Sequence, residues 1–151
     1  PNAYERIEAL RQPQQPQTDQ VFIAMWFDER MDAALDEGIR PAVVDAGYRP
    51  FRIDESQSNE KICDQIVEQI PKSRFVIADV TGHRPAVYYE AGYAKALGLE
   101  VIYTCRNDEK EKCCFDTRQY PHIFWETPET LREALKNRIE ATILPAQKKR
   151  S

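Results

Sequence analysis

Short apolar runs alternate with longer segments of helical period from Gln20 onward. The apolar runs cover residues 21–25, 48–53, 74–79, 100–104 and 122–125. The helical segments cover 28–46, about 58–72 and 85–97, and a last one opens at 127–129. This alternation predicts βαβ units on a parallel sheet. The simplest right-handed winding of five units gives the strand order 2-1-3-4-5, so we expect an α/β, flavodoxin-like three-layer sandwich with a five-stranded parallel sheet.

Local signals refine the helical segments. Gly47 is expected to cap the first of them, whereas Pro41 inside it predicts a kink or break near Gly38. Thr127 is expected as the N-cap of the last helix, with Pro128 in its first turn. Residues 105–121 are expected to form a polar loop. The inward face of the second helical segment is expected to carry Ile62, Ile66 and Ile70.

The ends of the chain differ from its middle. Tyr4, Ile7 and Leu10 have helical spacing, and the Pro/Gln-rich stretch that follows them predicts a semi-extended linker. We therefore expect residues 1–18 to be the end of an upstream region. Residues 19–145 are expected to form the compact domain, and 146–151 a solvated basic tail.

Composition excludes several classes of protein. With 21 basic and 25 acidic residues, the net charge of −4 argues against sequence-independent nucleic-acid binding, which needs a basic face. No apolar run approaches the ~20 residues of a membrane span, and the first residues lack the layout of a signal peptide. The four cysteines show no CxxC pair or zinc-finger spacing, so we expect reduced thiols and no metal. These features predict a cytoplasmic protein without a cofactor.

Ligands of doubly wound sheets bind beyond the carboxyl ends of the strands, at the switch point between the first and third strands. Neither GxGxxG nor GxxxxGK[ST] occurs, so the two commonest glycine-rich phosphate loops are absent from the sequence. The residues that follow the predicted strands are Trp26, Phe27, Asp28, Asp54, Asp79 and Arg106.

Glu90 stands among apolar residues on the third helical segment. The stripe expected to face the sheet consists of Ala86, Val87, Tyr93, Ala94 and Leu97. Glu90 falls in its middle. Removing an ionised carboxylate from water is costly unless it is paired. Glu90 is therefore either a working carboxylate in a cleft, the partner of Arg84 or Arg106 in an ion pair, or half exposed on a rotated helix.

The segment around Glu90 resembles a known group of proteins. Asp79-Val-Thr-Gly-His-Arg-Pro-Ala-Val-Tyr-Tyr-Glu90-Ala-Gly-Tyr-Ala-Lys-Ala-Leu-Gly98 is similar to the nucleoside 2-deoxyribosyltransferase-like superfamily, which shares its architecture with TIR domains. The match centres on the Glu-x-Gly-x-Ala pattern. The opening Val-Phe-Ile-Ala-Met-Trp-Phe of residues 21–27 resembles that group's first strand and aromatic loop. The resemblance covers about residues 21–104.

The resemblance implies that Glu90 attacks the anomeric carbon of a nucleoside. A carboxylate near this carbon can form a covalent ribosyl intermediate, as in retaining glycosidases. Water then completes a hydrolysis, or a second base completes a transfer. Trp26 and Phe27 would stack on the departing base, although both also suit core packing beneath the first helix.

Several acidic residues are candidates for supporting roles. Asp79 could hold a ribose hydroxyl or orient Glu90, or it could cap the turn before the helix. Asp54 could bind sugar or base, or be a solvated loop residue. Asp28 is expected to cap the first helix rather than to act in catalysis. The resemblance also points to Asp64, although its helical position places it on the polar side.

Tyr89 could hydrogen-bond Glu90, or be an ordinary partly buried tyrosine. The approach to Glu90 departs from the Gly/Ser-rich pattern of true transferases, since it reads His83-Arg84-Pro85-Ala86. Arg84, with Lys61, suits a phosphate better than a bare nucleoside. His83 could be a general acid for the leaving base or a surface residue.

Together these features predict an N-glycosidic-bond enzyme, a nucleoside or nucleotide 2-deoxyribosyltransferase or hydrolase. Two alternatives stay open: a TIR-like NAD glycohydrolase, and a non-catalytic nucleotide-sensing domain of a larger protein. The expected partner is a nucleoside, nucleotide or NAD-like molecule, with no nucleic acid or membrane. The sequence leaves a homo-oligomer open, because relatives commonly complete their sites across a subunit contact.

Overall fold

The computed structural model describes residues 18–53, 58–112 and 120–143, and these contain one parallel sheet of five strands in the order β2-β1-β3-β4-β5. The strands are β1 (Gln20–Ala24), β2 (Arg49–Phe51), β3 (Phe75–Asp79), β4 (Val101–Arg106) and β5 (His122–Trp125). The predicted flavodoxin-like fold and its strand order are confirmed.

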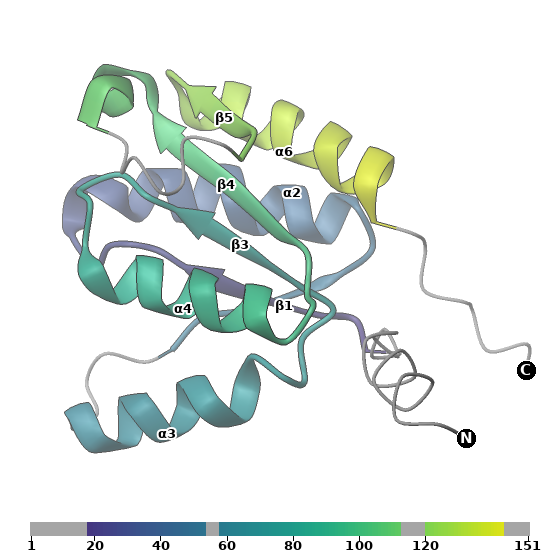
Figure 1. The fold of residues 1–151 in the computed structure, drawn as a ribbon. Helices are drawn as coiled ribbons and strands as arrows, with labels where there is room; N and C mark the ends of the chain where they lie inside the picture. The colour runs from purple at the N-terminus through teal and green to yellow at the C-terminus, as the bar shows by residue number, and fades with distance from the viewer. Residues whose placement is uncertain (1–17, 54–57, 113–119, 144–151) are drawn as a thin grey trace, which may run out of the picture.

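Helices cover both faces of the sheet and make three layers (Figure 1). One face carries α3 (Asn59–Gln69) and α4 (Pro85–Ala96). The other carries η2 (Ala34–Ile39), α2 (Arg40–Asp45) and α6 (Pro128–Thr142). Successive side chains of a strand point to opposite faces, so Val76 packs under α4 while Ile77 packs under the α2 and α6 layer. The central strands β1 and β3 therefore carry apolar side chains on both faces.

The first helical segment changes its winding rather than breaking. It opens with the 3₁₀ turn η1 (Glu29–Met31), continues as the π-helix η2 and ends as α2. Pro41, near the start of α2, has no N–H to donate to a carbonyl of the preceding turn. The wider π turns before it accommodate the proline without ending the helix. The predicted disturbance near Gly38 thus takes the form of a π-helix.

Gly38 lets this segment approach α6 closely. A Cβ at Gly38 would lie 3.0 Å from Cδ2 of Leu131 and 3.1 Å from the carbonyl oxygen of Pro128. A larger residue would force the two helices apart or displace Leu131.

The helix starts follow the predicted caps. Asp28 accepts a hydrogen bond from the N–H of Arg30 (2.9 Å), which satisfies a free donor at the start of η1. Thr127 accepts one from the N–H of Thr130 (3.2 Å) and forms a capping box with it. The predicted N-cap roles of Asp28 and Thr127 are confirmed.

The region after the fourth strand was predicted wrongly in part. Strand β4 continues through Cys105 and Arg106, and residues 107–112 form the 3₁₀ helix η3 (Asn107–Lys112) instead of irregular loop. Cys105 and Arg106 extend the strand because they pair with Phe124 and Trp125 of β5, a contact that local sequence does not reveal. The rest of the predicted loop, up to 119, lies outside the described residues.

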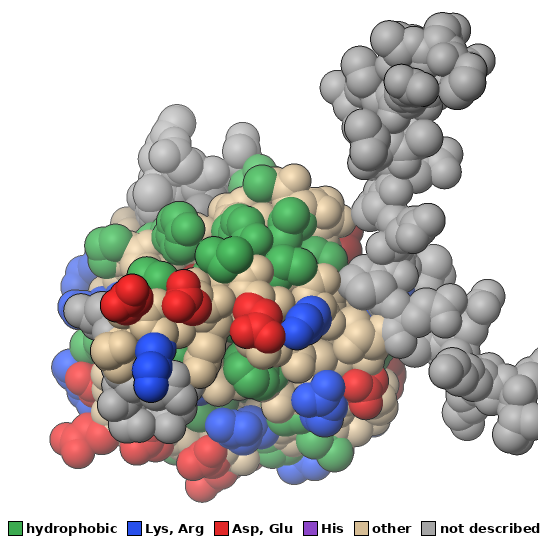
Figure 2. Space-filling view, turned by 90° about the horizontal axis from the view of Figure 1, so that it is seen from below, with side chains coloured by type: hydrophobic (Ala, Val, Ile, Leu, Met, Phe, Trp, Pro, Cys, Tyr) green, Lys and Arg blue, Asp and Glu red, His purple; other side chains and the backbone are tan. Residues whose placement is uncertain are grey.

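The last observations on the fold concern the length of its helices and its exposed side chains. The part of the chain described contains no helix long and apolar enough to cross a membrane. Seen from the α3 side, hydrophobic side chains gather among acidic and basic ones (Figure 2). Exposed hydrophobic side chains include Val67 on α3, Tyr89 on α4 and Leu97 directly after α4.

Most of the predicted 1–18 linker region and the 146–151 tail lie outside the described residues.

Candidate functional site

Glu90 lies on the buried face of α4. The inward side of the helix consists of Val87, Glu90, Ala91 and Ala94, and Glu90 is only 8% exposed. The predicted stripe was wrong at its edges, since Ala86 and Leu97 are exposed. Apolar residues stand on several sides of α4, so periodicity left its rotation loosely defined. Glu90 nevertheless points inward, as expected.

The carboxylate of Glu90 has an altered proton affinity. Burial raises its pKa from 4.5 to about 7, and the positive charge of Arg52 acts in the opposite direction. No hydrogen bond or ion pair among the described residues involves this carboxylate. Glu90 is therefore close to half ionised at neutral pH and has no fixed partner in the described part of the chain.

Arg52 joins Glu90 at the switch point of the sheet. It follows the end of β2, and its guanidinium lies 4.1 Å from the ring centre of Phe27. Its Nη2 lies 3.5 Å from the carbonyl oxygen of Trp26. Sequence reasoning missed Arg52, although the switch-point rule that nominated Asp54 applies equally two residues earlier. Asp54 itself lies outside the described residues.

Trp26 and Phe27 separate to opposite faces of the sheet. Phe27 packs against the hydrophobic cluster that contains α3 and α4, on the side of Glu90. Trp26 packs against the other cluster, and its ring covers Gly82 so closely that a Cβ there would lie 2.5 Å from Cε3. The guanidinium of Arg30 lies 4.5 Å from the centre of the same ring. The structure thus places Phe27 near Glu90 and uses Trp26 for packing.

Asp79 is fully buried at the end of β3. Its Oδ2 accepts hydrogen bonds from Oγ1 of Thr104 (2.6 Å) and Nε1 of Trp125 (2.9 Å), and its Oδ1 accepts one from the N–H of Thr81 (3.0 Å). Burial raises the pKa of this carboxyl, and the three hydrogen bonds act against that rise. Asp79 has no exposed surface; its hydrogen bonds join β3 to β4 and β5 and cap the turn after β3.

The other candidates lie outside this cluster. Arg84 is exposed at the start of α4, 5.9 Å from the ring centre of Trp26. Tyr89 is 60% exposed, so its side chain points away from the buried face of Glu90. Asp64 is exposed on α3. The structure brings together Glu90, Arg52 and Phe27, and it does not bring Asp64 or Tyr89 to them.

Two charged residues after the strands are occupied elsewhere. Asp28 holds the side chain of Arg30 (2.7 Å), and these hydrogen bonds lower its pKa to about 2. Arg106 pairs with Asp108 (2.6 Å) and lies 3.7 Å from Glu109. Neither is a partner of Glu90. Within residues 18–53, 58–112 and 120–143, no group of three or more His, Cys, Asp or Glu is placed to hold a metal ion.

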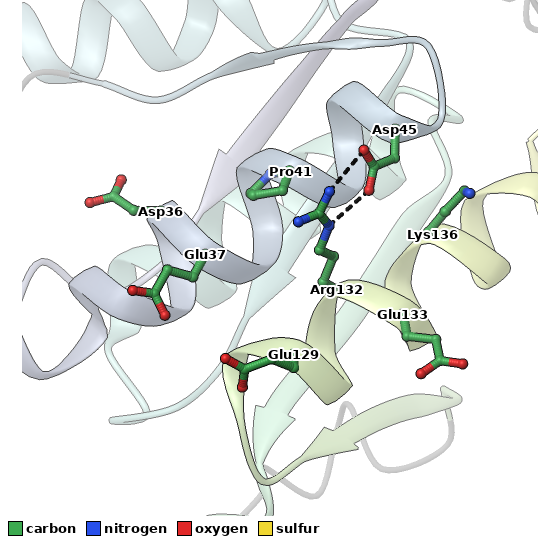
Figure 3. A pocket seen from close by; sticks show the side chains of 8 residues that line it. All are labelled: Asp36, Glu37, Pro41, Asp45, Glu129, Arg132, Glu133 and Lys136. Carbon is green, nitrogen blue, oxygen red and sulfur yellow. Dashed lines mark hydrogen bonds and ion pairs between the residues drawn. The ribbon is translucent and has the colours of Figure 1, made fainter.

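A separate groove of about 570 Å³ lies between α2 with η2 and α6 (Figure 3). A bidentate pair between Arg132 and Asp45, at 2.8 and 3.1 Å, spans it. The groove is on the opposite face of the sheet from α4, and none of the predicted site residues lines it. Its lining is Asp36, Glu37, Pro41, Asp45, Glu129, Arg132, Glu133 and Lys136.

Comparison with known proteins adds no relative to this geometry. No protein-family model matches the chain, and no curated protein matches it either.

Proposed function

We propose that this protein breaks the N-glycosidic bond of a nucleoside or nucleotide, with Glu90 as the nucleophile. The observation that carries the proposal is a buried carboxylate at the switch point of a parallel sheet, with a pKa near 7 and no fixed partner among the described residues. A purely structural buried carboxylate is expected to have donors around it, as Asp79 has. A buried carboxylate without them is typical of an active site.

The proposed reaction has two steps. In the first, the ionised carboxylate of Glu90 bonds to the anomeric carbon while the bond from that carbon to the base nitrogen breaks, and the base leaves with the bonding electrons. In the second, a water oxygen displaces the Glu90 carboxylate from the sugar and loses a proton to solvent. If a second base attacks in place of water, the reaction is a transfer.

The neighbours of Glu90 suit this chemistry. Arg52 favours the ionised form of Glu90, which is the form that attacks. Phe27 offers an apolar aromatic surface against which a base can pack. The Glu-x-Gly-x-Ala pattern that begins at Glu90, similar to nucleoside 2-deoxyribosyltransferase-like proteins, agrees with this assignment. We assign no contact with the substrate to Trp26 or Asp79, because both are engaged in packing or hydrogen bonds.

The test is release of base from three kinds of substrate. The protein is incubated with 2′-deoxynucleosides, with their 5′-monophosphates and with NAD, and free base or nicotinamide is measured by chromatography. We expect release by the natural sequence and a loss of about 1,000-fold or more in Glu90→Gln. The matched control is Glu100→Gln, an exposed glutamate before the amino end of β4, which should retain full activity.

The pH dependence tests the role of Glu90 separately. Since the ionised form attacks, the rate should rise about tenfold per pH unit below the pKa of about 7 and level off above it. Release from NAD alone would identify the TIR-like glycohydrolase activity. If no substrate releases base while a nucleotide still raises the melting temperature, the proposal is wrong and the protein is a nucleotide sensor.

A further inference from the structure

The carboxylate of Glu109 lies among donors from another part of the chain. Its Oε2 accepts a hydrogen bond from the backbone N–H of Gly82 (2.7 Å) and lies 3.3 Å from Nε2 of His83. Its Oε1 lies 3.7 Å from Nη2 of Arg106. The side chain of Glu109 is only 16% exposed, although η3 contributes no fully buried residue. We call the Gly82 N–H, the His83 ring and the Arg106 guanidinium the Gly82 cradle.

The backbone of the cradle is held in an uncommon shape. Gly82 has φ +83° and His83 has φ +49°, so two successive residues adopt the left-handed conformation, which a non-glycine side chain rarely takes. Trp26 packs directly on Gly82. The N–H of Arg106 donates to Oγ1 of Thr81 (2.9 Å), which ties the end of β4 to this turn. The backbone of the cradle is therefore fixed by contacts outside η3, whereas the Arg106 guanidinium also pairs with Asp108 of η3 (2.6 Å).

The cradle contains more hydrogen-bonding groups than the Glu109 carboxylate satisfies. Nε2 of His83 is buried and makes no hydrogen bond within the described residues, even though Glu109 is near. Nδ1 of the same ring lies 2.9 Å from the hydroxyl of Tyr88, which holds the ring in place. The positive charge of Arg30 also acts on Glu109. A planar carboxylate presents two oxygens to these groups, whereas a phosphate presents three and carries up to two negative charges.

We infer that the Gly82 cradle binds a phosphate group, and that Glu109 occupies it as an internal substitute until a ligand's phosphate displaces it. The third phosphate oxygen would satisfy Nε2 of His83. Displacing Glu109 requires η3 to move and the Arg106–Asp108 pair to separate or to move with it. This six-residue 3₁₀ helix has no fully buried side chain to extract. Glu109 then competes with the ligand's phosphate for the Gly82 cradle, and no residue of the cradle takes part in the proposed reaction.

The test compares phosphate binding by variants that lose the same charge on the same helix. Inorganic phosphate, adenosine 5′-monophosphate and adenosine are titrated calorimetrically in a phosphate-free buffer of constant ionic strength. We expect Glu109→Ala to bind inorganic phosphate at least about tenfold more tightly than the natural sequence. The control, Glu111→Ala, removes an exposed charge of η3 outside the cradle and should change affinity less than twofold. Glu109→Gln serves as a second variant that retains the side-chain volume, and melting curves check that each variant folds.

Removing a cradle donor should reverse the gain. Arg106→Gln in the Glu109→Ala background should return phosphate affinity to the natural level. Equal tightening in Glu109→Ala and Glu111→Ala, or a gain that survives Arg106→Gln, would mean a general charge effect and would overturn the inference. Tight binding of adenosine without its phosphate would overturn it as well.

Two further comparisons identify the source of the phosphate and test the inference independently of the proposed function. Tighter binding of the 5′-monophosphate than of inorganic phosphate identifies a nucleotide ligand, and equal binding identifies free phosphate. All titrations are repeated with Glu90→Gln, which blocks the proposed reaction. If Glu90→Gln leaves the phosphate affinity unchanged, the inference about the cradle holds even if the proposed function is wrong.

Discussion

Two buried carboxylates near the carboxyl edge of the sheet have opposite surroundings. Asp79 accepts hydrogen bonds from Thr104, Trp125 and Thr81, so its burial is compensated. Glu90 has the charge of Arg52 nearby and no hydrogen bond within the described residues. The first arrangement stabilises the junction of strands, whereas the second leaves a group that is costly to keep ionised. This contrast is the reason that we propose Glu90, and not Asp79, as the reactive carboxylate.

The first prediction concerns the stability cost of Glu90. Its folded pKa of about 7 lies above the unfolded value of 4.5, so the folded state binds the proton more tightly. The stabilisation from that proton is complete below pH 4.5 and is lost as the pH rises through 7. Glu90→Gln stays neutral and should be more stable than the natural sequence at pH 8, by on the order of 1 to 3 kcal/mol.

The measurement is the free energy of urea unfolding between pH 5 and pH 9. The difference between Glu90→Gln and the natural sequence should grow with pH and level off above pH 8. Glu100→Gln, which changes an exposed glutamate, should follow the natural sequence throughout. Parallel curves for Glu90→Gln and the natural sequence would show that burial does not raise the pKa of Glu90.

At the residue scale, sequence reasoning found Glu90 and missed Arg52 for a physical reason. A charged residue inside an apolar helical stripe stands out in the sequence, because removing a charge from water costs free energy. Arg52 follows a strand that ends at Phe51, and the direction of its side chain depends on how β2 lies beside β1. Trp26 and Phe27 are adjacent, yet they pack on different faces, which the aromatic pattern alone does not distinguish.

At the element scale, the turn between β3 and α4 is more tightly constrained than the helix it precedes. Gly82 has φ +83° and lies beneath the Trp26 ring, so both its backbone and its lack of a side chain are required. Gly92, inside α4, is exposed, and a Cβ added there would have no atom of the described residues within 4 Å. Two glycines that look alike in the sequence therefore have different importance.

The second prediction follows from this difference. Gly82→Ala should destabilise the protein by about 2 kcal/mol or more, because of the left-handed backbone and the contact with Trp26. Gly92→Ala, the matched control, should stabilise it by up to about 1 kcal/mol, because alanine favours a helix interior. Thermal unfolding of both variants measures the effect, and a neutral Gly82→Ala would show that the turn can change its shape.

Most elements were predicted from periodicity and caps, and the exceptions share a cause. The π-helix η2 and the 3₁₀ helix η3 were not predicted. Pro41 predicted a disturbance near Gly38 but not its π winding, and the extension of β4 through Arg106 depends on its pairing with β5. Contacts between distant segments decide such features, and a local window contains no trace of them.

At the scale of the whole molecule, helices cover both faces of the sheet (Figure 1). A separate hydrophobic cluster lies on each face. In the described residues, the buried hydrophobic side chains run from Val21 to Ile143. They come from every strand but β2 and from helices on both sides, so each face is covered by its own layer. From the contacts within the described residues, we expect this core to form without the segment before Thr18.

The third prediction tests that independence. A chain that begins at Thr18 should unfold cooperatively, with a melting temperature within about 2 °C of that of the full chain. The melting temperature is measured by circular dichroism for both chains at the same concentration. The control is Leu135→Ala, which opens the fully buried core under α6 and should lower stability by about 2 to 5 kcal/mol. A large loss on truncation would mean that residues 1–17 belong to the folded unit.

The sequence by itself determined the order of strands and helices, the two-sided burial of the sheet, the caps at Asp28 and Thr127 and the inward position of Glu90. These depend on periodicity and local hydrogen bonding, which a short window of residues contains. Only the tertiary structure decided that the charge of Arg52 acts on Glu90, that Asp79 is enclosed by donors from two other strands and that Glu109 reaches the Gly82 turn. Those contacts join residues far apart in the chain, and their geometry depends on how the strands and loops pack together.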